Sequence, residues 1–351
     1  MSEHIRPLLA ITMGDPAGVG PEVVVAALAS RRVRAACRPL VVGDARVLRR
    51  AAAALGRPFP ARSVASAAEA DRHPRRICLL DLANADPHEI PMAHVSAAAG
   101  RAAAQCISRA VETARSRQVA AVVTAPVNKE ALRLADIPYP GHTEMLAALC
   151  GAPEVAMLLV HGPLRVAHVT THVAVRQACQ RLSLSRVLSV IGLTDDALRR
   201  MGLPRRRIAV AGLNPHAGES GLFGAEEIRE IAPAVAAAQA RSLDAVGPLP
   251  ADTVFARHRA GEFDAVVAML HDHGHIAIKT VGFVPGRGGR MRTAGVNVTL
   301  GLPIIRTSAY HGTAFDIAGR GLADPTSMIE AILLAAQMAS PGGSTSPRAQ
   351  C

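Results

Sequence analysis

Short runs of β-branched residues alternate with alanine-rich stretches along most of the chain, and this alternation restricts the fold more than any other feature. Helical stretches are expected at about 22–30, 96–117, 143–149, 184–200, 225–241 and 327–338. The strand-like runs are Leu8–Thr12, Pro39–Val42, Ile77–Leu80, Val119–Thr124, Val166–Thr170, Ile208–Gly212 and Ala265–Met269. The pattern predicts an α/β protein with a mainly parallel sheet. In such sheets, ligands bind at the carboxyl ends of the strands.

Composition limits the size and the location of the protein. Half of the 351 residues are apolar, which is enough for one large core or two lobes of roughly 150 residues each. The six cysteines form no Cys-x-x-Cys pair, which favours a reducing compartment. No secretory signal precedes the first strand, and no apolar run reaches the roughly 18 residues of a membrane span. We therefore expect a cytoplasmic protein without a membrane partner.

The net charge of +11 is dispersed rather than gathered in one stripe. Arginines occur as pairs and triplets such as Arg205-Arg206-Arg207, which are typical of solvated surfaces. Aromatic residues make up only 2% of the chain and tryptophan is absent, so stacking platforms for single-stranded nucleic acid are not expected. The sequence predicts no nucleic-acid partner, and the positive charge fits an anionic small substrate.

Lysine is rare in this chain, and its two positions lie in motif-like segments. Only Lys129 and Lys279 are lysines among 39 basic residues. Either each site needs a compact amine, or the two lysines persist by chance. The stretch from Met269 to Gly321 contains Lys279, a run of histidines, Arg306 and several glycines. This density of metal ligands, cations and turn residues predicts an active site.

A glycine-rich loop, Met13–Glu22, follows the first predicted strand and precedes the first helix. Its glycines permit a tight turn and close approach to a ligand. Their spacing is not Gly-x-Gly-x-x-Gly, and we find no acidic residue at the position that a Rossmann fingerprint requires. We therefore exclude a Rossmann domain, and a purely structural turn is the alternative reading of this loop.

Three histidines follow three different predicted strands. His172, His216 and His271 would reach one divalent ion if the strand ends converge, leaving positions open for a substrate. Taken singly, each is more often a hydrogen-bonded loop histidine, and spacing alone does not show convergence. The later histidines of the run His271–His275 would share a face with His271 if the strand continued, but Gly274 indicates that the strand has ended.

Eight ordered motifs resemble one enzyme family. They are Thr12–Glu22, Thr124–Lys129, Tyr139–Glu144, Thr170–His172, Gly212–Glu219, Gly247–Thr253, His271-Asp272 and Gly295–Ser308. The chain is similar to the family of 4-hydroxythreonine-4-phosphate dehydrogenase, which includes the sibling 4-phospho-D-threonate/D-erythronate dehydrogenase. The resemblance implies an α/β fold like that of isocitrate and isopropylmalate dehydrogenases, with two lobes and a non-Rossmann NAD site. It also implies a homodimer with active sites at the subunit interface.

The resemblance divides the chain and assigns residues. Residues 1–130 and 280–339 would form the NAD-binding lobe, 131–279 the metal-binding and dimerisation lobe, and 340–351 a disordered tail. The implied metal ligands are His172, His216 and His271, the last from the partner subunit, and the implied substrate contacts are His142, Thr143, Lys279, Asn297 and Arg306. The implied cofactor residues are His311, Gly312, Thr313, Ala314, Asp316 and Gly319, and candidates for proton transfer are Lys129 and Asp272.

The implied cofactors are NAD and a divalent metal. Asp316 would repel a 2′-phosphate, which favours NAD over NADP. Three imidazoles favour zinc, with cobalt, nickel, magnesium or manganese left open. The metal would ease hydride departure from the 3-hydroxyl of a phosphorylated four-carbon hydroxy acid, and the resulting β-keto acid would decarboxylate.

The sequence motifs constrain the identity of the substrate less than they constrain the reaction. The 4-hydroxythreonine-4-phosphate enzyme of pyridoxal phosphate biosynthesis is the preferred reading, and the phosphothreonate/erythronate 3-dehydrogenase of sugar-acid catabolism is the alternative. A terephthalate dihydrodiol dehydrogenase is disfavoured by Asn128-Lys129, Gly141–Thr143 and Arg306, and an inactive metal-binding regulator is a remote alternative. Two departures from the family pattern stand near these motifs: Tyr310 replaces an acid, and Val284–Ala294 forms a longer arginine-bearing loop.

Overall fold

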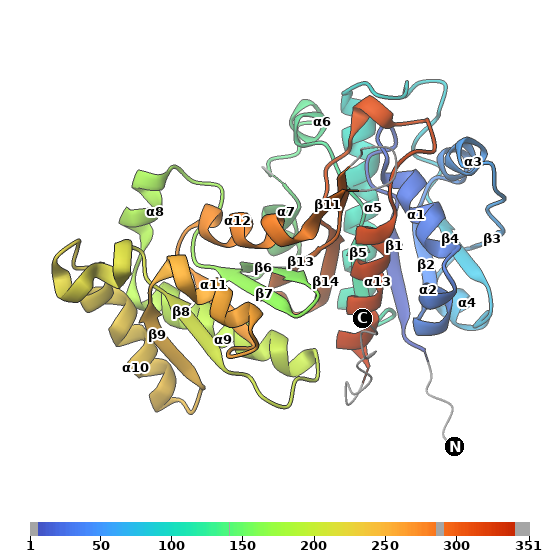
Figure 1. Cartoon of the computed structure of the whole chain (residues 1–351). Helices are drawn as coiled ribbons and strands as arrows, with labels where there is room; N and C mark the ends of the chain where they lie inside the picture. Colours follow the sequence, from blue (N-terminus) through green and yellow to red (C-terminus); the bar gives the residue numbers. More distant parts are fainter. Residues whose placement is uncertain (1–5, 140, 286–290, 341–351) are drawn as a thin grey trace, which may run out of the picture. The chain divides into compact units, whose positions relative to one another are not determined.

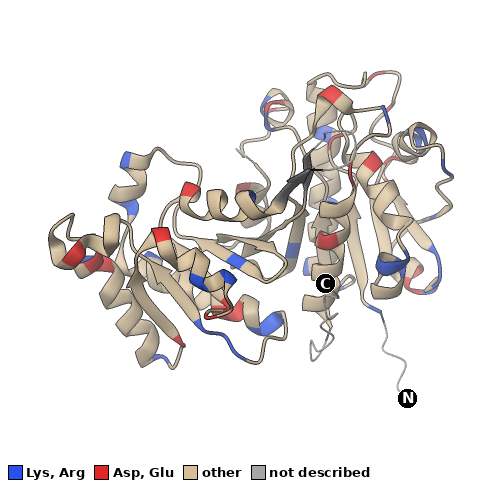
Figure 2. Cartoon of the chain, viewed as in Figure 1, with Lys and Arg blue, Asp and Glu red and all other residues tan. Residues whose placement is uncertain are grey.

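The computed structural model describes residues 6–139, 141–285 and 291–340, which form two compact units. Unit 1 comprises Met1–Val155 and Val284–Ala339, and unit 2 comprises Ala156–Phe283. The predicted α/β class with two parts is confirmed. Within the described ranges, no helix is both long and apolar enough to cross a membrane. Basic and acidic residues are interspersed over the elements of both units (Figure 2).

Unit 1 is built on seven neighbouring strands in the order β3-β4-β2-β1-β5-β14-β13. All neighbours pair in parallel except β14 and β13, which are antiparallel. The strands are β1 (Leu8–Thr12), β2 (Arg38–Gly43), β3 (Ala61–Val64), β4 (Ile77–Asp81), β5 (Ala121–Thr124), β13 (Val296–Leu300) and β14 (Ile305–Ala309). β1 and β5 are buried at every residue, as expected for parallel strands covered on both faces.

Helices cover both faces of these strands. The helix α5 packs on β1, β2 and β5, whereas α13 packs on β5, β13 and β14, and Figure 1 shows the two helices on opposite sides. The helices are α1 (Gly20–Leu28), α2 (Arg31–Ala36), α3 (Ala45–Ala54), α4 (Ala67–Asp71), α5 (Ala97–Arg115), α6 (Lys129–Leu134), α7 (His142–Cys150), η4 (Phe315–Ile317) and α13 (Thr326–Ala339). A short pair, β11 (Phe283–Pro285) and β12 (Met291–Thr293), borders residues 286–290 of the arginine loop, which lie outside the described residues.

The first boundary between the units falls after Val155, whereas the sequence predicted it after residue 130. The reason is that α6 and α7 pack on α5. Gly100 of α5 lies so close to the carbonyl of Ala131 that an added Cβ would clash with it. Arg115 of α5 donates to the carbonyl oxygen of Leu149 at 2.7 Å. The second boundary falls after Phe283, close to the predicted position after residue 279. The roles assigned to the two lobes stay predictions.

Unit 2 contains five strands in the order β6-β7-β10-β8-β9, in which β6 and β7 are antiparallel and the other neighbours parallel. The strands are β6 (Ala156–His161), β7 (Leu164–His168), β8 (Ile208–Ala211), β9 (Ala245–Leu249) and β10 (Ala265–Ala268). The helices are α8 (Val175–Arg181), α9 (Leu184–Arg200), η1 (Pro215–Gly221), η2 (Glu227–Ile231), α10 (Ala232–Ala240), α11 (Ala251–Arg259) and α12 (His271–Gly282). The predicted helix 225–241 is therefore a π-helical turn followed by an α-helix.

The histidine run after β10 forms a helix. The prediction that the strand has ended before Gly274 is confirmed, because α12 begins at His271. Residues four apart lie on the same side of a helix, so His271 and His275 are neighbours. Their rings stack with centroids 3.6 Å apart.

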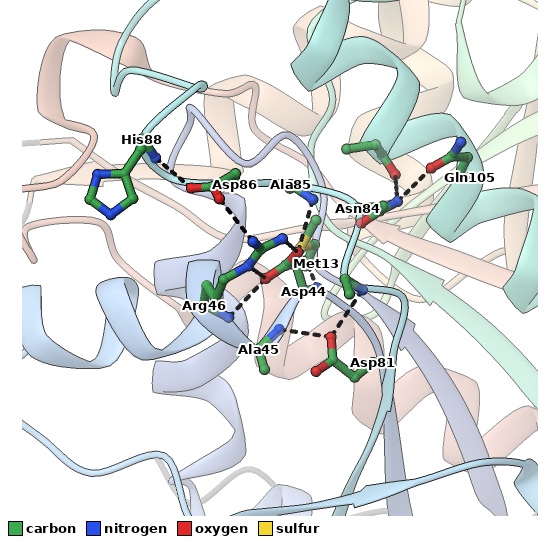
Figure 3. Close-up of polar contacts among 12 residues, drawn as sticks. Met13, Asp44, Ala45, Arg46, Asp81, Asn84, Ala85, Asp86, His88 and Gln105 are labelled. Atoms are coloured by element: carbon green, nitrogen blue, oxygen red, sulfur yellow. Dashed lines mark hydrogen bonds and ion pairs between the residues drawn. The ribbon is translucent and has the colours of Figure 1, made fainter.

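In unit 1, carboxylates fix the loops that follow β2 and β4 (Figure 3). Asp44 caps α3 by accepting from Arg46 N at 2.8 Å, and it also accepts from Ala85 N and the Arg46 guanidinium. Burial opposes ionisation of Asp44, but these hydrogen bonds outweigh it and lower the pKa. Asp44 is an acidic residue at the end of the second strand, which the sequence interpretation did not count. The Asp44 carboxylate is occupied by the hydrogen bonds that cap α3 and hold Ala85. The exclusion of a Rossmann ribose site therefore still holds, although the sequence prediction did not take Asp44 into account.

Candidate active site

A row of polar side chains crosses unit 1 at the carboxyl ends of its central strands. Thr12, Thr124 and Ser308 are register neighbours on β1, β5 and β14, and Asn297 of β13 pairs with Ser308. Residues in register project from the same face of a sheet. Thr307 donates to the Ala331 carbonyl of α13, so the row faces the opposite side, away from α13.

Two atoms of this row lack hydrogen-bond partners. The Thr12 hydroxyl and Asn297 Oδ1 are buried and bond to no described residue. Nearly all buried polar atoms in proteins are paired, so orphaned atoms on one face point to a missing ligand. The predicted substrate contact Asn297 lies in this row. Thr12 and Thr124 were not predicted, although the signal was present, since each is the polar last residue of an apolar strand.

Arg306 lies buried beside this row, with 1% of its surface exposed. Its guanidinium donates to the hydroxyl of Thr299 at 2.8 Å and to that of Thr124 at 2.6 Å, while Nε has no partner. Burial lowers the pKa of Arg306 to about 9, so the group stays charged at neutral pH. Within the described ranges, no carboxylate forms a hydrogen bond with the Arg306 guanidinium, although the charge of Glu144 partly opposes the lowering of its pKa. A buried cation without a hydrogen-bonded anion is costly, which makes this position suited to an anionic ligand.

Arg306 and Lys129 both lie close enough to His142 for their charges to act on its ring. His142 begins α7, and its Nε2 is buried and has no hydrogen-bond partner among the described residues. Burial, with the charges of Arg306 and Lys129, lowers the pKa of His142 well below its usual value, so the ring is neutral. The Lys129 Cε atom is 3.4 Å from the position that a Cβ on Gly141 would occupy. The predicted contact Thr143 is half-buried in the same turn.

The loop after β1 contributes a buried carboxyl group that sequence reasoning missed. Asp15 is fully buried, and its Oδ1 accepts from Ala17 N at 2.8 Å while Oδ2 has no partner in the described part of the chain. Burial raises the pKa of Asp15 to about 6, although backbone hydrogen bonds from Ala17 and Asn128 oppose the shift. Its backbone N–H donates to the Pro126 carbonyl at 2.9 Å, which joins the loop after β1 to the loop after β5.

The predicted cofactor residues lie together in the segment between β14 and α13. They are His311, Gly312, Thr313, Ala314, Asp316 and Gly319. The segment packs against the glycine-rich loop, because Val19 N donates to the Thr313 carbonyl at 2.9 Å. His311 Nε2 is buried and has no described hydrogen-bond partner. The Asp316 side chain is exposed.

In unit 2 the structure brings two of the three predicted metal ligands together. The rings of His172 and His271 have centroids 5.7 Å apart. His271 Nδ1 lies 2.7 Å from Asp272 Oδ1. A carboxylate accepts, so Nδ1 carries the proton and Nε2 offers its lone pair, as in metal-binding histidines oriented by a carboxylate. Asp272, predicted as a candidate for proton transfer, is thus placed to orient His271. Lys279 is exposed in the last turn of α12.

His216 lies in an unusual loop. Five consecutive residues from His216 to Ser220 have positive φ, at about 1–2 kcal/mol for each non-glycine residue. Glu227 of the π-helical turn accepts from Leu213 N and Asn214 N at 2.7 and 2.8 Å, which holds this loop. Within the described residues of one chain, no group of three His, Cys, Asp or Glu side chains is arranged to hold a metal ion. The full triad therefore stays a prediction.

Buried His168 was not predicted as part of the site. Its ring lies 4.9 Å from that of His275, and its Nε2 has no hydrogen-bond partner in the ranges described. Burial, with the neighbouring histidines, lowers the pKa of His168 to about 3, so the ring is neutral. His168, His275, His271 and His172 thus form a cluster of imidazoles in unit 2.

Fold and site define a two-unit α/β protein with a buried cationic, hydroxyl-lined cluster in one unit and an imidazole cluster in the other. The family model described as pyridoxal phosphate biosynthetic protein PdxA matches residues 35–335. The chain belongs to this family, which confirms the predicted resemblance.

Individual relatives match nearly the whole chain. D-threonate 4-phosphate dehydrogenase of Cupriavidus necator is 48% identical, covering 97% of this chain and 99% of the relative. 4-Hydroxythreonine-4-phosphate dehydrogenase of Trichlorobacter lovleyi is 45% identical, covering 95% and 98%. The solved structure of 4-hydroxythreonine-4-phosphate dehydrogenase from Klebsiella pneumoniae has a TM-score of 0.85 and 48% identity, covering 97% of this chain and 100% of that one.

Proposed function

We propose that this protein is a dehydrogenase that oxidises the 3-hydroxyl of a phosphorylated four-carbon hydroxy acid with NAD, and that D-threonate 4-phosphate is its substrate. The observation that carries the proposal is the buried Arg306 guanidinium, which has an unpartnered Nε and no hydrogen-bonded carboxylate within the described ranges. A phosphate or carboxylate would supply the missing anion. Relatives of both substrate types, at 48% and 45% identity, support the same chemistry.

The named relatives favour a hydroxy acid over an amino acid as substrate, because D-threonate 4-phosphate dehydrogenase of Cupriavidus necator is 48% identical and 4-hydroxythreonine-4-phosphate dehydrogenase of Trichlorobacter lovleyi is 45% identical. D-threonate 4-phosphate carries a hydroxyl at the position where 4-hydroxythreonine 4-phosphate carries an ammonium. 4-Hydroxythreonine 4-phosphate, the substrate preferred from the sequence, is the second candidate, supported by the relative and the solved structure of that name.

The residues present fit NAD and a divalent metal in part. The segment 311–319 would hold the cofactor, with exposed Asp316 available to the ribose hydroxyls. His172 and His271 present neighbouring imidazoles for a metal. When bound, the metal would polarise the reacting hydroxyl and stabilise the enolate charge during decarboxylation. The chain's own residues bind and orient: Arg306 holds an anionic group, neutral His142 accepts a hydrogen bond, and Asp272 aligns His271.

We propose a homodimer in which a second copy completes the metal site. One chain lacks a three-ligand group within its described residues. Unit 2 also exposes large apolar side chains close in sequence to each predicted ligand: Val175 after His172, Leu222 and Phe223 after His216, and Ile276 after His271. Exposed apolar groups that gather in one patch mark protein interfaces, and such a patch beside the predicted ligands would fit a subunit contact. A second copy of this chain is the occupant, because it would also supply the missing imidazole.

A substrate panel tests the proposed activity. NADH formation at 340 nm is followed with D-threonate 4-phosphate, 4-hydroxythreonine 4-phosphate and unphosphorylated D-threonate, using NAD and then NADP. We expect the highest kcat/KM with D-threonate 4-phosphate and NAD. Arg306→Met keeps an unbranched chain of about the length of the aliphatic part of arginine but removes the charged guanidinium, so kcat/KM should fall by about ten- to a hundredfold or more, since a charge-assisted hydrogen bond contributes roughly 1.5–3 kcal/mol.

Arg165→Met is the matched control. Arg165 belongs to unit 2, and its guanidinium donates to the backbone carbonyls of Pro163 and Asp264, which is a structural role. This variant should keep the substrate preference of the wild type. The proposal fails if the wild type reduces NAD with none of the phosphorylated acids. Wild-type kinetics in Arg306→Met would remove Arg306 from the substrate site.

A further inference from the structure

We infer that Glu22 is a positioning residue that holds the segment 311–321 in the shape required to bind the dinucleotide. The inference rests on the proposed function, since it concerns the cofactor assigned there. Glu22 lies in the first turn of α1, with 1% of its surface exposed. Its position in the glycine-rich motif gave no sign of this role, because the partners are about 300 residues away in the chain.

Both carboxylate oxygens of Glu22 are engaged by one end of the segment. Oε1 accepts from Gly319 N at 2.5 Å, and Oε2 accepts from Gly321 N at 2.8 Å. Both glycines have positive φ, at 79° and 64°, so the turn that aims these N–H groups at Glu22 suits glycine. Among side chains of this length, only that of an ionised glutamate offers two acceptor oxygens and no donor.

The remainder of the segment is fixed independently of Glu22. Tyr310 N donates to the Ser327 hydroxyl at 2.7 Å, and the Thr313 carbonyl accepts from Val19 N at 2.9 Å. Gly18 lies so close to Thr313 that an added Cβ would be 2.9 Å from its side chain. The exposed Asp316 lies between the Thr313 anchor and the Glu22 anchor, so loss of either anchor would release it.

Glu22→Gln is the sharpest test because it preserves size. The amide keeps one acceptor oxygen, but its NH2 group would face a backbone N–H, and two donors cannot pair. The Gly319–Gly321 end should detach, and the affinity for NAD should fall by about tenfold or more. We would measure the affinity of the full-length protein for NAD by isothermal titration calorimetry and amide exchange of residues 311–321. Groups that contact the substrate are unchanged, so KM for NAD should rise much more than kcat changes.

Glu227→Gln is a matched control in the other unit. Glu227 is also a buried carboxylate that accepts from two backbone N–H groups, but it holds the His216 loop. It should leave the affinity for NAD at the wild-type value and weaken the binding of zinc in a chelator competition assay. Glu22→Gln should show the reverse pattern. A purely structural role of Glu22 would not separate the two ligands in this way.

A second variant keeps the test decisive if Glu22→Gln does not fold. Glu22→Asp keeps the carboxylate but shortens the side chain by one methylene group, so it should no longer accept from both Gly319 N and Gly321 N and should also weaken NAD binding. Unchanged affinity for NAD in a folded Glu22→Gln protein, or in Glu22→Asp when Glu22→Gln does not fold, would overturn the inference and leave the proposed function intact. Failure of the wild type to bind NAD would overturn both.

Discussion

Buried polar atoms without partners are the residue-scale evidence for a ligand site. Thr12, Asn297, Arg306 and His142 each have such an atom, and all belong to unit 1. Desolvating a hydroxyl, amide or guanidinium without a partner costs free energy, so a folded chain keeps several together where a ligand compensates. Three of the predicted substrate contacts, His142, Asn297 and Arg306, are thus marked by a buried polar atom without a described partner.

At Asp15, the free-energy cost of burying a polar group can be measured as a change of stability with pH. Its pKa is about 6 in the folded protein against 3.8 for an ordinary aspartate. Below about pH 4, Asp15 is protonated in both the folded and the unfolded protein, and its contribution to the free energy of unfolding is fully present. That contribution is lost as the pH rises to about 6, because Asp15 ionises at a lower pH in the unfolded protein than in the folded protein. The loss is on the order of 3 kcal/mol. In Asp15→Asn this decline should be absent, as measured by urea denaturation between pH 4 and 7.

Asp44 provides a comparison of opposite sign. Its pKa is lowered in the folded protein, so its contribution to stability is present at neutral pH and is lost on acidification. Asp44→Asn should therefore lower the free energy of unfolding most at neutral pH. Asp15→Asn should not show this larger destabilisation at neutral pH. Parallel pH profiles for wild type and Asp15→Asn would show that Asp15 is ionised in the folded protein at pH 5.

At the scale of elements, the sequence predicted those whose signal is local. The long alanine-rich stretch 96–117 matches α5, and the apolar runs at 8–12 and 265–269 match β1 and β10. The strand β6 was missed, and β7 was placed slightly late, ending at residue 170 rather than at His168. Antiparallel pairs such as β6 and β7 break the strand-helix alternation on which the prediction depended.

Other features depend on contacts that sequence does not show. The segment from His271 contains Gly274, a weak helix former, yet it forms α12. A side chain at Gly274 would collide with Nε2 of His168, which lies about 100 residues earlier, so the glycine is required by tertiary packing. Likewise, the row from Thr12 to Asn297 exists only through the register of four strands that are distant in sequence.

Gly100 and Gly192 test whether a helical glycine is required by packing. Gly100 of α5 faces the backbone of α6, and an added methyl group would collide with the Ala131 carbonyl. Gly100→Ala should therefore lower the free energy of unfolding by about 1–3 kcal/mol. Gly192 of α9 has no neighbour within 4 Å of the added Cβ, so Gly192→Ala should raise it by about 0.5–1 kcal/mol. Thermal denaturation of both variants measures the difference, and equal effects would contradict it.

For the whole molecule, the central question is whether one chain suffices for activity. Arg306, His142 and Lys129 all belong to unit 1 of a single chain, but the three predicted metal ligands are not assembled as a group within the described residues. A chain that needs a second copy for one imidazole is inactive as a monomer, however well it folds. This dependence distinguishes a shared site from a dimer that only gains stability.

Mixing two inactive variants separates these cases. If each metal site takes His216 from one subunit and His271 from the other, both His216→Ala and His271→Ala homodimers should be inactive. A heterodimer of the two contains one site with both defects and one intact site. Random mixing makes half of the dimers heterodimers, so activity should recover to about one quarter of the wild-type value. The two variants are co-expressed with different tags, and NADH formation is assayed with D-threonate 4-phosphate. If all three histidines act within one chain, no dimer contains an intact site, and the mixture stays inactive although the tags show that heterodimers have formed.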